Sequence, residues 1–175
     1  MGSNNMKKPI ALCACIAVGG LMGMPANAQI PGFNGSWSLS QDKSEGPKAV
    51  CEYLHYAVTA SEEHYIVDEL EKDGTKFNTE YRAKYDGKEY ANKNLVTGVV
   101  NYVKLRKVFD RTEQLTNIRK EPGPNGTVVS KVTGYYIRVL SPDGKSITST
   151  LIDAEGQVTA VRVFEKVSDT PKPHC

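Results

Sequence analysis

The stretch from residue 127 to residue 167 contains three strand-like runs joined by two short turns, and it limits the possible folds more than any other part of the chain. β-branched and aromatic residues fill the runs, and Asp143-Gly144 and Glu155-Gly156 supply the residues that tight hairpin turns favour. Pro142 fixes its own φ and ends the run before it. The pattern predicts an antiparallel meander. Three such strands are not stable alone, so the rest of the chain must cover or close them.

The first 28 residues have the pattern of a secretory signal peptide. Lys7 and Lys8 precede an apolar run that extends from Pro9 to Met24, and Ala26-Asn27-Ala28 then provides a small-x-small cleavage site. A transmembrane anchor fits less well, because the run is shorter than the roughly 20 apolar residues of a span and contains several glycines. A lipoprotein signal ending at Cys13 would leave only a stub of apolar residues before the cysteine.

Cleavage after Ala28 would leave a chain of 147 residues with 20 basic and 20 acidic side chains, because both lysines of the leader would be removed. That length corresponds to one domain with a substantial core. The neutral balance argues against binding to nucleic acid or to an anionic membrane surface, since both need a basic patch. We expect one β-barrel domain over residues 29–167, a tail over residues 168–175, and no membrane span after cleavage.

Two cysteines, Cys51 and Cys175, remain after the leader is removed. In an oxidising compartment a single pair is most simply a disulfide, here between the last residue and a point near the first strand. Loop-closure entropy would make such a bond worth about 4–5 kcal/mol at most. Two free thiols are the alternative.

Further alternating runs precede the meander, and turn residues separate most of them. In the run 75–85, Phe77, Tyr81, Ala83 and Tyr85 share one face and charged residues share the other. Only residues 90–98 show no clear period. We expect the following strands: 36–40, 53–60, 64–70, 75–85, 99–108 and 112–120, with the three of the meander. The sequence therefore predicts an all-β protein, an up-and-down antiparallel barrel or strongly curled meander of about 8–10 strands. A sandwich would need longer connections than most of those present.

Gly35-Ser36-Trp37 in the first expected strand resembles the G-x-W signature of lipocalins and lipocalin-like barrels. The later motifs Ser141-Pro142-Asp143-Gly144-Lys145-Ser146 and Val163-Phe164-Glu165-Lys166 are similar to those of small exported bacterial proteins of that kind, mostly of unassigned function. The resemblance implies a lipocalin-like barrel in which Trp37 closes the floor and an Arg from the closing strand, here Arg162, lies against it. The C-terminal helix typical of lipocalins has no counterpart in the sequence.

A lipocalin-like barrel implies a cup for a small apolar or amphipathic molecule, and tyrosine is the most frequent aromatic residue of this chain. Tyrosines would give an apolar cavity with hydroxyl groups for orientation. Each one can equally be an ordinary strand residue in the core or on the outer surface. The candidate ligand-binding residues are Tyr56, Tyr65, Tyr81, Tyr85, Tyr102 and Tyr136.

His55 and His64 lie on either side of an expected hairpin, where Glu62, Glu63 and Asp68 are near in sequence. Such a group can form an acid/base pair or a metal site, but the spacing fits no known ligand pattern. The sequence also contains no nucleophile elbow, zinc-protease motif or phosphate-binding loop. We therefore name no catalytic residue, no metal ligand and no cofactor.

Three hypotheses for function remain, all for a periplasmic or secreted bacterial protein. The first is a lipocalin-like barrel that binds a small apolar or amphipathic ligand. The second is an interaction or inhibitor module that contacts a protein partner through the loops Ala91–Gly98 and Glu121–Gly126. The third is a small barrel isomerase or cyclase, which would need a buried polar pair.

Overall fold

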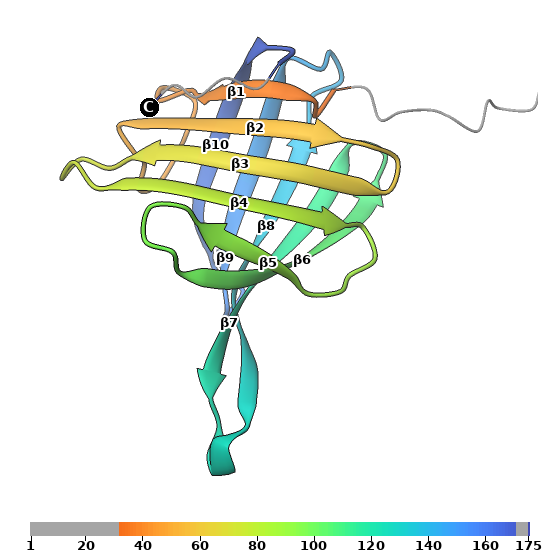
Figure 1. Cartoon of the computed structure of the whole chain (residues 1–175). Helices are drawn as coiled ribbons and strands as arrows, with labels where there is room; N and C mark the ends of the chain where they lie inside the picture. The colour runs from red at the N-terminus through yellow and green to blue at the C-terminus, as the bar shows by residue number, and fades with distance from the viewer. Residues whose placement is uncertain (1–31, 171–174) are drawn as a thin grey trace, which may run out of the picture.

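The computed structural model describes residues 32–170 and Cys175. Ten antiparallel strands form a closed barrel in which each strand pairs with its neighbours in the chain, and β1 pairs with both β2 and β10 (Figure 1). The strands are β1 (Gly35–Leu39), β2 (Cys51–Val58), β3 (Glu62–Leu70), β4 (Lys76–Lys84), β5 (Tyr90–Asn94), β6 (Val100–Phe109), β7 (Thr112–Pro122), β8 (Val128–Leu140), β9 (Ser146–Asp153) and β10 (Val158–Ser168). The predicted up-and-down barrel is confirmed.

The residues of the turns explain why the strands pair in the order in which they follow one another in the chain. At the β8–β9 turn the Asp143 carboxylate accepts a hydrogen bond from the Lys145 amide (3.1 Å), and Gly144 adopts a φ of 68° that other residues rarely take. Short turns of this kind let consecutive strands pair directly, so the sheet closes without a crossover. The β7–β8 connection contains a short 3₁₀ turn, Pro124–Gly126, and the far ends of these two strands extend well beyond the barrel (Figure 1).

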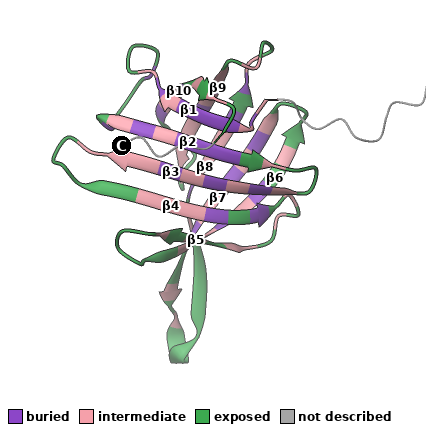
Figure 2. Ribbon diagram, turned by 45° about the horizontal axis from the view of Figure 1, so that its top comes forward, coloured by how far each residue is buried: buried purple, intermediate pink, exposed green. Residues whose placement is uncertain are grey.

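Strict alternation divides the side chains between the interior and the outer surface. On β4, Tyr81 and Ala83 are buried as the sequence pattern predicts, while Arg82 and Lys84 on the other face are exposed. Figure 2 shows the buried positions recurring along most strands. An apolar core fills one part of the barrel, and its largest fully buried residues include Trp37, Tyr56, Leu140, Ile147 and Phe164.

Trp37 lies at the centre of this core with no exposed surface, and its indole N–H donates a hydrogen bond to the carbonyl of Phe33 (2.9 Å). The resemblance implied that Arg162 would lie against it. The structure instead places Lys166 of β10 there, with its Nζ 5.5 Å from the ring centroid. Arg162 lies four residues earlier on the same inward face and contacts carboxylates.

The disulfide between Cys51 and Cys175 is present, which confirms this prediction. It holds the last residue of the chain beside the start of β2, with a Cα–Cα distance of 6.0 Å. The expected signal peptide, residues 1–28, and residues 171–174 of the expected tail lie outside the described residues. Within the described part of the chain, no helix has the length and hydropathy that a membrane span requires.

Candidate functional site

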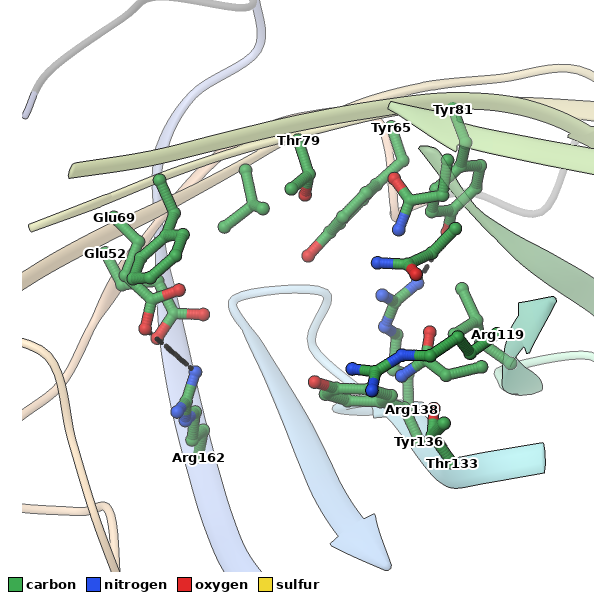
Figure 3. A pocket seen from close by; sticks show the side chains of 16 residues that line it. Glu52, Tyr65, Glu69, Thr79, Tyr81, Arg119, Thr133, Tyr136, Arg138 and Arg162 are labelled. Carbon is green, nitrogen blue, oxygen red and sulfur yellow. Dashed lines mark hydrogen bonds and ion pairs between the residues drawn. The ribbon is translucent and has the colours of Figure 1, made fainter. Parts of the chain in front are cut away.

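A cavity of about 330 Å³ lies inside the barrel, beyond the apolar core (Figure 3). Inward-facing residues of β2, β3, β4, β5, β6, β7, β8 and β10 line it, so nearly the whole barrel wall contributes. The lining combines aromatic and aliphatic surface with carboxamides and three arginines. A concave interior site with a few polar groups is the usual form of a small-molecule site.

A buried arginine forms the floor of the cavity. Arg138 of β8 donates from its Nη1 to the Tyr81 hydroxyl (2.9 Å) and to Glu113 Oε1 (3.0 Å), and Glu63 Oε1 lies 3.5 Å from the same nitrogen. Tyr81 in turn donates its hydroxyl to Glu63 (2.5 Å), and Tyr85 donates to the other oxygen of that carboxylate (3.1 Å). Alternation on β3, β4, β7 and β8 directs these side chains inward, where they satisfy one another.

One of the two carboxyl groups of the floor has a strongly perturbed pKa. The pKa of Glu113 is raised well above its usual range, because the group is fully buried and because Glu63 is close to it. Glu63 accepts hydrogen bonds from the hydroxyls of Tyr81 and Tyr85 and lies beside the same guanidinium. We infer that Glu113 carries a proton near neutral pH.

Aromatic rings surround the same guanidinium. The Cζ of Arg138 lies 4.4 Å from the Tyr65 ring centroid, and the rings of Tyr56 and Tyr136 are 5.6 and 5.7 Å away. Tyr65 also stacks on Tyr81, with 4.9 Å between the ring centroids. Attraction between a desolvated cation and aromatic faces compensates part of the cost of burying Arg138.

A second charged group lines another part of the cavity wall, on the left in Figure 3. Arg162 Nη1 is 2.7 Å from Glu52 Oε2 and 3.7 Å from Glu69 Oε1. Burial and the charge of Glu52 raise the pKa of Glu69 to about 7, and burial also raises the pKa of Glu52. This group therefore takes up or releases a proton near neutral pH.

The remaining polar lining is less fully paired. Carboxamides of Asn92, Asn101 and Asn117 face the cavity, and the Oδ1 of Asn92 is buried without a hydrogen-bond partner among the described residues. Arg119 of β7 extends its guanidinium into the cavity (Figure 3). These groups can bind polar atoms of a ligand.

The six candidate tyrosines take different positions. Tyr65, Tyr81 and Tyr136 line the cavity together. Tyr56 is buried beside Tyr65 and Phe33, in the core. Tyr85 packs against the core, donates to Glu63 and has the Lys107 ammonium over its ring. Tyr102 lies between the inward positions of β6, so it is on the outer face, where Lys120 Nζ is 3.7 Å from its ring.

Sequence reasoning missed the charged residues of the site, which are Glu52, Glu63, Glu69, Glu113, Arg119 and Arg138. A signal for some of them was present, because Arg138 has the same parity as Tyr136 and Leu140 in a strand that was predicted correctly. A charged residue on the apolar face of a predicted strand indicates a buried ion pair or a binding site.

The histidines do not face each other, because His64 pairs with Ala57 and His55 with Ile66. His64 contacts Glu80 (2.6 Å). His55 is buried, with its Nδ1 2.9 Å from Ser36 Oγ and its Nε2 3.4 Å from Asp68. All these residues have the outward parity of their strands, so the barrel wall separates them from the cavity. No cluster of residues suited to a metal occurs within the described residues.

The sequence matches no protein-family model, and a comparison with curated proteins finds no match. Arguments about function therefore rest on the fold and on the cavity.

Proposed function

We propose that this protein binds a small amphipathic molecule in the cavity of its barrel. The observation that carries this proposal is the cavity itself, which lies beyond a well-packed core and combines aromatic surface with polar groups. Its volume is at the lower end of the range for small-molecule sites, so a compact ligand fits best. The charged lining favours an amphipathic ligand over a purely apolar one, because a hydrocarbon would leave polar groups desolvated and unpaired.

Binding of a neutral aromatic dye tests this proposal. N-phenyl-1-naphthylamine fluoresces strongly in apolar surroundings, and we expect saturable binding with a stoichiometry of one. Val67 is buried and lines the cavity, so Val67→Phe should fill part of it and weaken binding about tenfold or more. Ile66→Phe adds the same ring on the outer face of the same strand and should change nothing. Equal binding by both variants would place the dye elsewhere and refute the proposal.

We also propose that the protein is exported to the periplasm or secreted. The signal-peptide pattern of residues 1–28 and the disulfide between Cys51 and Cys175 support this, since disulfides persist in oxidising compartments. Expression of the full chain in a bacterium, followed by intact mass spectrometry of the periplasmic fraction, tests it. We expect a chain beginning at Gln29 with two hydrogens fewer than the reduced form. An unprocessed, reduced chain in the cytoplasm would refute the proposal.

A protein-interaction role is the second candidate, because one of the predicted loops exposes apolar residues. Leu95, Val96, Val99 and Val100 around the β5–β6 turn are all exposed, although the second predicted loop, Glu121–Gly126, is mainly polar. Exposed apolar clusters often mark contact surfaces. The interaction role would be favoured if the protein did not bind the dye but associated with a partner protein through the β5–β6 turn.

A further inference from the structure

The three arginines of the cavity differ in how their charges are balanced. Arg138 forms ion pairs with Glu63 and Glu113. Arg162 forms ion pairs with Glu52 and Glu69, and all four nitrogen–oxygen distances are 3.7 Å or less. Arg119 has no ion-pair or hydrogen-bond partner among residues 32–170 and Cys175, yet it lines the cavity between these two groups. Its charge is the one that the cavity wall does not neutralise.

The protonation of the carboxyl groups increases this imbalance. Glu113 holds its proton near neutral pH, and Glu69 is only partly ionised there, since its pKa is raised to about 7 by burial and by Glu52. Glu63 and Glu52 lie against Arg138 and Arg162 and not against Arg119. Arg119 is exposed to solvent where it lines the cavity, and it contributes a positive charge that no carboxylate among the described residues balances.

Polar and apolar side chains both line the cavity. Asn92 and Asn117 lie on β5 and β7, on the same side as Arg119, and the Asn92 Oδ1 has no partner. Tyr65, Tyr136 and Val67 provide aromatic and aliphatic surface on β3 and β8. A ligand with one charged end and an apolar body would match both surfaces at once.

We propose that the ligand is an amphipathic anion with a carboxylate or an equivalent acidic group, and that Arg119 binds this group while Tyr65, Tyr136 and Val67 contact the apolar body. This inference rests on the proposed binding function. Arg119 presents a planar donor pair that suits a carboxylate, and the carboxamides nearby supply further hydrogen bonds. A cationic ligand would instead be repelled by Arg119 and would have to displace Arg162 from its carboxylates.

Displacement of N-phenyl-1-naphthylamine by three ten-carbon probes tests the ligand class. Decanoate, decanol and decylammonium share one alkyl chain and differ only in the charge of the head group. Measured below their micelle concentrations at pH 7, decanoate should displace the dye at about tenfold lower concentration than decanol, as a charge-assisted hydrogen bond implies. Decylammonium should be the weakest. Equal affinities, or tighter binding of decylammonium, would overturn the inference.

Arg119→Gln then tests the residue. It should reduce decanoate affinity about tenfold and leave decanol unchanged, because only the charged head group loses its partner. Lys120→Gln is the matched control, since it removes the same charge from the next residue, which faces outward over Tyr102. Equal losses in both variants would indicate only a general effect of net charge and would contradict the assignment of Arg119. If the dye does not bind at all, the binding function itself is refuted. If the dye binds but decanoate does not displace it better than decanol, only the ligand class is wrong.

Discussion

Glu63 and Glu113 should substitute for each other as the anion beside Arg138, so that replacing both costs much more stability than the two single replacements predict. Arg138 is 3% exposed, and both carboxyl groups lie within 3.5 Å of its Nη1. Because Glu113 is protonated in the intact protein, Glu113→Gln keeps its charge state and its size. We expect this variant to lose less than about 1 kcal/mol of unfolding free energy.

Glu63→Gln removes the neighbouring carboxyl group that helps to raise the pKa of Glu113. Glu113 can therefore ionise and balance Arg138, and the loss should be limited to about 1–2 kcal/mol from the weakened hydrogen bonds of Tyr81 and Tyr85. The double variant leaves a buried guanidinium without an anion. Removing the partner of a buried charge typically costs about 3–5 kcal/mol, so the coupling between the two sites should be about 1–3 kcal/mol.

Urea unfolding at pH 7, followed by circular dichroism, measures the four free energies of this double-mutant cycle. Glu165→Gln is a useful control, because Glu165 makes a shorter contact with Lys43 (2.6 Å) but on the exposed surface, where little change is expected. Additive losses would refute the reasoning, since they would show that the two carboxyl groups act independently. A large loss in Glu113→Gln alone would show that Glu113 is the ionised partner.

Two further predictions concern stability. The pKa of Glu69 is raised from 4.5 to about 7, so the folded state holds a proton that the unfolded state releases, and the unfolding free energy should fall as pH rises from about 4.5 through 7. In urea unfolding, Glu69→Gln should flatten this fall and gain about 1–3 kcal/mol at pH 8. An unchanged pH profile would contradict the raised pKa of Glu69. The Cys51–Cys175 bond closes a loop with a sequence separation of 124, and its reduction should lower the unfolding free energy by up to about 4–5 kcal/mol. Cys51→Ser should reproduce this loss, and the stability of the variant should not change with reductant. A variant as stable as the oxidised protein would show that the bond contributes nothing to stability.

The parts of the fold that the sequence predicted are those where local chemistry decides the structure. The Asp143-Gly144 turn and the alternation of β4 depend only on neighbouring residues, and short turns of this kind imply the order of the strands. β5 (Tyr90–Asn94) was missed for a physical reason. Of its inward residues only Tyr90 packs against the apolar core, while Asn92 faces the cavity, so this short strand has little apolar period to detect.

The candidate site was less predictable, because its members come together from distant parts of the chain. Arg138 and Glu63 are 75 residues apart in sequence, and a charged residue in a strand is normally expected on the surface. Nothing local to Glu63 indicates that it faces inward, since it was assigned to a turn. Only the register of β3 against its neighbours, which depends on barrel closure, brings Glu63, Tyr81 and Arg138 to one level of the interior.

The same strands contribute inward residues to both the apolar core and the cavity. β10 places Phe164 in the core and Arg162 at the cavity, and β2 does the same with Tyr56 and Glu52. Apolar residues at all these inward positions would fill the barrel and avoid the cost of burying charges. Barrel closure by itself does not require charged residues at these positions, and their arrangement around an interior space supports the proposed binding function.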